Sequence, residues 1–172
     1  MNKIKVKKEK GKRSKFLTFK LGPEEYGLEI DKVLEIIGLQ EITPVPKTPA
    51  YIRGVINLRG LIHPVIDLNY KFGMGITKPT KETCIIVVNN NRNGQQEQMG
   101  MIVDSVSEVE DIHEDDIEDA PKLGDSVNTD FICGIAKTKG KVKMLLDLQN
   151  TLSKQEFEIV NKVSQSNQEI NK

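Results

Sequence analysis

The side chains that could carry out catalysis are few in this sequence, and none lies in a recognisable catalytic motif. Cys84 and Cys133 both fall in apolar runs without a second ligand nearby, so we interpret them as small buried hydrophobic residues. His63 precedes a proline inside a strand-like run, where a structural histidine is expected. The 172 residues contain no glycine-rich phosphate loop, zinc-binding spacing or nucleophile elbow. We therefore expect no enzymatic activity, no cofactor and no bound metal.

The remaining candidates lie in the stretch GVINLRGLIHPVIDL, residues 54–68, where Asn57 and Arg59 interrupt an apolar run. Arg59-Gly60 separates two β-rich segments and predicts a tight hairpin. A guanidinium at such a turn can bind a carboxylate through two hydrogen bonds and hold two loops in register. Arg59 is therefore predicted to shape a surface that another protein recognises.

Charge is balanced over the whole chain but unevenly distributed along it. There are 25 basic and 25 acidic residues, yet residues 1–15 hold eight Lys or Arg and residues 104–119 hold nine carboxylates. The first segment is predicted to be a flexible basic tail. The second lacks the ligand pattern of a calcium loop and is predicted to be a solvated loop. The zero net charge gives no reason to expect nucleic-acid binding.

The elements that must position these residues occur twice. Each copy contains an aromatic residue, a glycine, a second glycine six residues later, and an apolar run that ends in Asp-Leu. Three segments match in the same order: Tyr26–Ile36 with Met99–Val109, Ile42–Pro46 with Ile117–Pro121, and Tyr51–Leu68 with Phe131–Leu148. The chain is therefore an internal duplication, with loops of different length in the two copies.

Each copy is predicted to form about five short strands. A helix over Ile30–Ile37 also fits the apolar spacing, but the equivalent segment breaks this pattern with Ser105 and Ser107, which favours a strand. The predicted strands are Phe16–Leu21, Tyr26–Ile30, Val33–Ile37, Ile52–Leu58 and Ile62–Leu68, and CIIVV, MGMIVD, VSEVEDI, ICGIAKT and VKMLLDL in the second copy. So many strands in so few residues predict two small closed barrels with a groove between them.

The domain limits follow from the repeats. The first repeat covers about 16–74 and the second about 82–152. The periodicity leaves open whether strands are exchanged between the barrels. Residues 153–172 are predicted to form a short helix and a frayed tail, with Leu152, Phe157 and Val160 on one side. No apolar stretch reaches membrane-spanning length, so we expect a cytoplasmic protein without direct membrane insertion.

The order FKLGPEEYGLEIDKVLEI, ITPVPKTPAYIRGVINLRGLIHPVIDL, IIVV, MGMIVDSVSEV and FICGIAKTKGKVKMLLDL resembles the CheW family of chemotaxis coupling proteins over residues 16–152. This resemblance implies an all-β fold of two SH3-like five-stranded barrels. It also implies a non-catalytic adaptor that joins the cytoplasmic tip of chemoreceptors to the regulatory domain of the histidine kinase CheA, and that is recruited to receptor arrays.

The same resemblance implies which residues bind the receptor, a helical hairpin thought to lie in the groove between the barrels. The positions that match are Val33, Glu35, Gly54, Asn57, Arg59, Thr83, Val106 and Val109. Glu35 is implied as the carboxylate that pairs with Arg59. Core burial remains the alternative for the valines, and a bulge or a crowded backbone is the alternative for Gly54.

The resemblance does not indicate individual kinase-binding residues, and the apolar segment Ile36–Leu39 is a candidate for the kinase surface. Three alternatives remain open. The chain could be the CheW-like module of a CheV-type or other two-component protein. It could instead be a nucleic-acid-binding β-barrel or a small-molecule-binding barrel.

Overall fold

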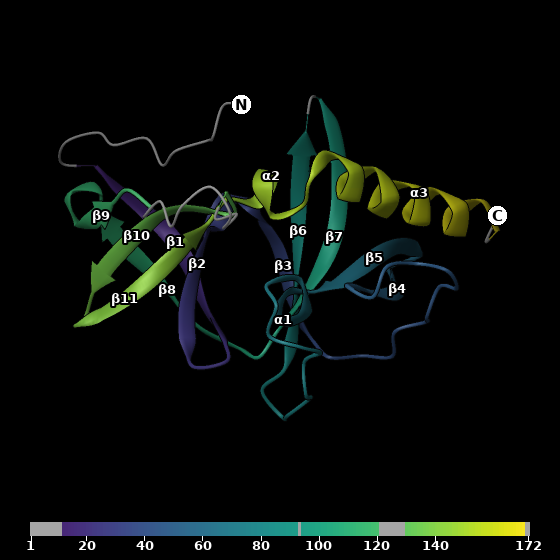
Figure 1. Cartoon of the computed structure of the whole chain (residues 1–172), viewed down its shortest axis with the longest axis horizontal. Helices are drawn as coiled ribbons and strands as arrows, with labels where there is room; N and C mark the ends of the chain where they lie inside the picture. Colours follow the sequence, from purple (N-terminus) through teal and green to yellow (C-terminus); the bar gives the residue numbers. More distant parts are fainter. Residues whose placement is uncertain (1–11, 93, 121–129, 171–172) are drawn as a thin grey trace.

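The computed structural model describes residues 12–92, 94–120 and 130–170 (Figure 1), and most of this part of the chain is strand. The strands are β1 (Arg13–Leu21), β2 (Glu24–Glu29), β3 (Val33–Gly38), β4 (Ile52–Leu58), β5 (Leu61–Asp67), β6 (Cys84–Arg92), β7 (Gln95–Val103), β8 (Ser105–His113), β9 (Ile117–Glu118), β10 (Ile132–Thr138) and β11 (Lys141–Leu146). The helices are η1 (Ile30–Lys32), α1 (Leu68–Lys71), η2 (Glu114–Asp116), α2 (Leu148–Thr151) and α3 (Lys154–Ile170).

The strands form two sheets, and each sheet makes one barrel. Barrel 1 has the order β8-β1-β2-β11-β10-β9, and barrel 2 has the order β3-β6-β7-β5-β4. They lie side by side in Figure 1, barrel 1 to the left and barrel 2 to the right. Because β9 contains only two residues, barrel 1 has five full strands and a short sixth. The predicted all-β fold of two small barrels is confirmed.

Each barrel contains strands from both repeats. The hairpin β1–β2 of the first repeat pairs with β8 and β11 of the second. Conversely, the hairpin β6–β7 of the second repeat pairs with β3 and β5 of the first. Two connections between consecutive strands cross from one barrel to the other: η1 between β2 and β3, and Asp104 alone between β7 and β8. The repeats have therefore exchanged their first hairpins.

Strand register shows the same duplication in three dimensions. Val65 lies opposite Gly100 in the parallel pair β5–β7, and its repeat-equivalent Leu145 lies opposite Gly27 in the parallel pair β11–β2. The antiparallel hairpins β4–β5 and β10–β11 shift register at the same place, next to Gly54 and next to Gly134. Duplicated sequence has therefore produced duplicated bulges.

Burial of apolar side chains holds each barrel together and joins the two. Small clusters fill the interiors, around Leu145 in barrel 1 and Val65 in barrel 2. A larger cluster contains residues from both barrels, so one continuous core spans the interface. A row of stacked rings crosses this region, formed by Phe19, Tyr26, Phe72 and Phe131. Removal of this apolar surface from water is the main driving force for docking the barrels.

The C-terminal helix α3 packs on barrel 2. Its first turn is a capping box, since the Ser153 and Glu156 side chains each accept a hydrogen bond from the other's backbone N–H, at 3.1 and 2.8 Å. Phe157 and Val160 are buried, as the sequence predicted, and the helix lies against β5. The helix continues to Ile170, further than the short helix that the sequence predicted, and residues 171–172 lie outside the described part.

Two sequence expectations near the N-terminus of barrel 1 need correction. The acidic segment 104–119 forms β8, η2 and β9, so the predicted strand VSEVEDI is confirmed but the loop prediction for the rest of the segment is wrong; Ile112 and Ile117 are buried, and most of the charges are exposed. Strand β1 begins three residues before the predicted Phe16, because Arg13 pairs with His113. The rest of the predicted basic tail, residues 1–11, lies outside the described residues. The strand prediction for Val33–Ile37 is confirmed.

Candidate functional site: a hairpin ion pair and an inter-barrel groove

Arg59 forms a forked ion pair with Glu35, as predicted. Its Nη1 donates to Glu35 Oε2 at 2.5 Å, and its Nη2 donates to Oε1 at 3.3 Å. Arg59 and Gly60 form the tip of the β4–β5 hairpin, with φ angles of 53° and 85°. Such positive φ values at both turn residues fit the twist of a two-residue hairpin. The pair therefore fastens the tip of this hairpin to β3.

Asn57 shapes the turn that presents Arg59. Its Oδ1 accepts a hydrogen bond from the Gly60 N–H at 3.0 Å, which closes the turn from within. This bond satisfies a backbone donor in the same way as an Asx-turn. Asn57 thus acts on the site by holding the hairpin tip in shape.

Barrel 1 contains a second copy of the ion pair. Lys139 Nζ donates to Glu108 Oε1 at 2.6 Å, and Lys139 also has a φ of 53°. Lys139 and Glu108 are the repeat-equivalents of Arg59 and Glu35. The hydrogen bond from Lys139 lowers the pKa of Glu108, and the same bond raises the pKa of Lys139. The duplication has therefore kept both the turn and the sign of its charge, but not the forked geometry.

Gly54 is required by the backbone. Its φ is +142°, and a Cβ at this position would lie 2.1 Å from the carbonyl oxygen of Thr43. Thr43 and Val55 exchange two backbone hydrogen bonds of 2.9 Å, which bring the chain this close. The bulge alternative for Gly54 is correct, so any effect of this residue on recognition passes through the fold.

The predicted valines are divided between the core and the surface. Val33 and Val106 are partly buried and pack against the shared core. Val109 lies on the outer face of β8 with half of its surface exposed. Thr83 is buried, and its Oγ1 accepts a hydrogen bond from the Thr80 N–H at 2.8 Å. Among these residues Val109 is therefore the one most accessible to a partner.

A groove runs between the barrels beside some of these positions. We call it the inter-barrel groove; it encloses about 490 Å³ and is lined by Lys20, Glu82, Cys84, Ser105, Val106 and Ser107. Barrel 1 supplies Lys20 from β1 and the residues of β8, and barrel 2 supplies Cys84 from β6. Of the eight predicted residues, Val106 lines the groove and Thr83 lies between two lining residues. The other six are not among the lining residues.

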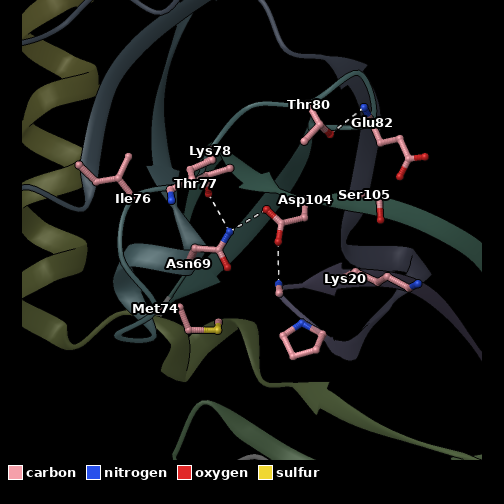
Figure 2. Close-up of a pocket in the computed structure, with 12 residues that line it drawn as sticks. Lys20, Asn69, Met74, Ile76, Thr77, Lys78, Thr80, Glu82, Asp104 and Ser105 are labelled. Atoms are coloured by element: carbon pink, nitrogen blue, oxygen red, sulfur yellow. Dashed lines mark hydrogen bonds between the residues drawn. The ribbon is translucent and has the colours of Figure 1, made fainter.

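A wider cavity of about 720 Å³ continues this groove, and Lys20, Glu82 and Ser105 line both. We call it the connector cavity because the connection between β5 and β6 forms much of its wall. Figure 2 shows its apolar side chains Met74 and Ile76 near one end and polar side chains around the rest. Nothing in the sequence distinguished the lining residues of the connection between β5 and β6, since that connection contains no periodic pattern and no repeat-equivalent.

Burial favours the uncharged form of two groups, Cys84 and His63. Burial raises the pKa of the Cys84 thiol, and burial lowers the pKa of His63 against opposing effects from Gln98 and Glu35. Cys84 is buried as predicted, but Cys133 is only partly buried, and its Sγ donates to the Leu145 carbonyl at 3.5 Å. Within the described ranges, no group of three or more His, Cys, Asp or Glu could hold a metal ion.

Apolar side chains are exposed on the outer face of barrel 2. Ile36 is 44% exposed and Leu39 is 38% exposed, and Leu34 and Leu61 are also exposed. Scattered exposed apolar residues are normal, but a group of them around one strand and its neighbouring hairpin suggests a protein contact. Two joined barrels with a hairpin ion pair, a groove and such a face define a binding scaffold as the class of protein.

Comparison with known proteins identifies the kind of scaffold. The family model described as CheW-like domain matches residues 15–156, and the chain therefore belongs to the CheW family. It is 37% identical over 151 residues to the chemotaxis protein CheW of Klebsiella aerogenes, covering 88% of this chain and 89% of that protein. It is 36% identical over 140 residues to CheW of Helicobacter pylori, covering 81% of each.

A solved structure agrees with this assignment. The scaffolding protein CheW from Thermoanaerobacter tengcongensis superposes with a TM-score of 0.72 and 41% identity, covering 81% of this chain and 92% of that one. The CheV3 protein of Helicobacter pylori is 31% identical, but the match covers only 40% of its length. The chain is a chemotaxis coupling adaptor, and neither a CheV-type module nor a nucleic-acid-binding barrel is favoured.

The CheW family is known as a family of non-catalytic scaffolds that act with chemotaxis signalling partners. In the part of the chain that the structure describes, no helix is both long and apolar enough to cross a membrane.

Proposed function

We propose that this chain couples transmembrane chemoreceptors to the histidine kinase CheA in the cytoplasm, without catalysing a reaction itself. One barrel surface would bind the regulatory domain of CheA while the groove side binds the cytoplasmic tip of the receptor. Receptor arrays at the membrane would thereby recruit the protein. Its membership of a family of chemotaxis scaffolds supports this proposal.

The observation that carries the receptor part is the inter-barrel groove. An α-helix with its side chains is about 10–12 Å across, and helical ligands bind grooves through a few anchor residues on one face. Small and polar residues such as Ser105 and Ser107 line one side of the groove, and they would allow a helix to approach closely. Lys20 and Glu82 offer opposite charges that could fix its register.

The hairpin ion pair supports a second contact with the same receptor tip. Arg59 is 78% exposed at its side chain, whereas Glu35 is 26% exposed, so the pair presents a cation to solvent and keeps its carboxylate partly covered. For the kinase, the exposed residues Ile36 and Leu39 of barrel 2 are the surface we favour, because apolar side chains on an outer strand can pack against a similar barrel.

A reconstituted kinase assay tests this function. Purified CheA and receptor-containing membranes are mixed with and without the protein, and transfer of labelled phosphate from ATP to CheA is followed. We expect strong receptor-dependent stimulation only when all three components are present. Stimulation that is equal without the protein would contradict the proposal. The control is the Arg59→Ala variant, which should bind CheA but stimulate less.

A further inference from the structure

Asp104 is the whole connection between the barrels at one crossing. Strand β7 of barrel 2 ends at Val103, and strand β8 of barrel 1 begins at Ser105. The backbone N–H of Asp104 donates to the Lys20 carbonyl at 3.1 Å. Lys20 and Ser105 both line the inter-barrel groove. The position of this one residue therefore sets the positions of two groove residues.

The carboxylate of Asp104 bonds to both barrels. Its Oδ2 accepts from the Gly22 N–H at 2.6 Å, in the turn between β1 and β2 of barrel 1. Its Oδ1 accepts from Asn69 Nδ2 at 2.9 Å, in helix α1 beside barrel 2. Figure 2 shows Asn69 and Asp104 facing each other among the residues that line the connector cavity. A charged acceptor makes such bonds stronger than neutral ones.

Asn69 is itself held firmly. It is buried, and its Nδ2 also donates to Thr77 Oγ1 at 2.8 Å. Thr77 donates to Asp67 through its hydroxyl at 2.6 Å and its N–H at 2.9 Å. The chain of bonds therefore runs from a buried carboxylate in β5, through Asp104, to the hairpin turn of the other barrel. Such a network fixes geometry because each bond is directional.

The other crossing between the barrels lacks this arrangement. There, the repeat-equivalent of Asp104 is Asp31 in η1. Asp31 is exposed, and within the described residues its carboxylate makes no hydrogen bond. The shared apolar core joins the barrels, but apolar contact is non-directional and tolerates sliding. The hydrogen-bonded link therefore occurs at the crossing that borders the groove.

We propose that Asp104 is a positioning residue that fixes the angle between the two barrels, and through it the width of the inter-barrel groove. It need not touch a partner. The consequence for binding rests on the proposed receptor function, whereas the consequence for barrel orientation does not.

Residual dipolar couplings of the ¹⁵N-labelled protein test the orientation directly. In the wild-type chain, the N–H vectors of both barrels should fit one alignment tensor. In Asp104→Ala the two barrels should require different tensors, whereas the matched control Asp31→Ala should behave like the wild type. A single unchanged tensor for folded Asp104→Ala would overturn the proposal.

Two further measurements cover the case in which Asp104→Ala fails to fold. In the wild-type protein, the Gly22 amide proton should be shifted downfield and protected from exchange, because it bonds to a carboxylate; rapid exchange would overturn the proposal. Asp104→Asn keeps an acceptor for Gly22 but turns an N–H₂ group towards Asn69. Adding Asn69→Asp restores a donor–acceptor pair with residue 104 but removes the donor to Thr77, so the double variant should recover the wild-type tensor in part, and no recovery would contradict the bond between residues 69 and 104.

Binding then separates this proposal from the function on which it rests. We expect Asp104→Ala to weaken receptor-tip binding at least about fivefold, a typical size for coupling between sites, and to leave binding of the CheA regulatory domain unchanged. A changed barrel orientation with unaltered receptor affinity would support the link and contradict the groove as receptor site. Equal loss of both affinities would contradict a specific effect on the groove.

Discussion

Arg59 and Glu35 form a forked ion pair across 24 residues of sequence, and Lys139 and Glu108 repeat it on the other barrel. Both cations sit at hairpin tips with the same φ of 53°. Both carboxylates lie in the first strand after a barrel crossing, β3 or β8. Retention of the pair in both halves indicates that it helps to hold the fold together. The side chain of Arg59 is more exposed than that of Lys139, so the first copy is the better candidate for recognition.

Replacing Arg59 should affect binding more than folding. Because its side chain is 78% exposed, Arg59→Ala should lower the free energy of unfolding by no more than about 1 kcal/mol. Receptor-tip affinity, measured by isothermal titration calorimetry, should fall, while affinity for the CheA regulatory domain should not. Wild-type receptor affinity in this variant would contradict a role for Arg59 in recognition.

The repeat supplies a matched control for that experiment. Lys139→Ala removes the equivalent cation from barrel 1 and should leave receptor affinity unchanged. The exchange of Glu35→Arg with Arg59→Glu should recover part of the lost affinity if the pair acts as a unit. If the exchange recovers nothing while Arg59→Ala still weakens binding, Arg59 contacts the receptor directly.

The two bulge glycines should differ in their tolerance of a methyl group. Gly54→Ala should cost about 3–5 kcal/mol, because it combines an unfavourable φ with a Cβ 2.1 Å from a carbonyl oxygen. In Gly134→Ala, the nearest atom is a side-chain methyl of Ile117 at 3.0 Å, so a cost of about 1–2 kcal/mol is expected. Guanidinium unfolding followed by circular dichroism measures both, and equal losses would refute the argument.

Barrel 1 contains a buried ion pair that should be sensitive to the loss of either partner. Lys143 and Glu110 are 3% and 5% exposed, with Nζ and Oε2 2.6 Å apart, and Thr138 bonds to both. Lys143→Met should cost about 3–5 kcal/mol, because it leaves a buried carboxylate unpaired. Adding Glu110→Ile, which copies the repeat-equivalent Ile37, should recover most of that loss. A double variant as unstable as the single one would contradict this explanation.

Stability should decrease on mild acidification because of His63. Burial lowers its pKa in the folded protein below the ordinary 6.5, so the unfolded chain binds the proton more readily. Its contribution is therefore present above pH 6.5 and is lost as pH falls through that value towards the folded pKa. His63→Gln should flatten this part of the stability curve, measured by denaturant titration from pH 7.5 to about 5. His113→Gln, the control at the other histidine, should leave the His63-dependent slope in place.

Local features of the fold could be predicted because neighbouring residues determine them. Arg59-Gly60 is a two-residue hairpin since its residue types and flanking β-rich runs require one. Gly54 and Gly134 are equivalent in the repeat, and both lie at bulges. The partner of Arg59 was implied only by family resemblance, since no spacing rule connects residues 24 positions apart.

Pairing between distant segments could not be predicted from the pattern. The exchange of the hairpins β1–β2 and β6–β7 leaves the alternation of apolar and polar residues in every strand unchanged. The periodicity of the sequence therefore does not indicate the exchange. The nine carboxylates of residues 104–119 suggested a loop because six of them are exposed, in β8, η2, β9 and the residue that follows β9. Asp104 ends the predicted strand MGMIVD, and its role could not be predicted because it depends on Gly22 and Asn69, both remote in sequence.

We propose that one chain binds receptor and kinase at separate surfaces. Chemical-shift mapping on the ¹⁵N-labelled protein tests it most directly, with a receptor-tip hairpin added first and the CheA regulatory domain second. We predict that the receptor fragment perturbs Val106, Ser107 and the Arg59 hairpin, and that the kinase domain then perturbs a different set around Ile36 and Leu39 without displacing it. Perturbation of the same residues by both ligands, or displacement of one by the other, would contradict binding at separate surfaces.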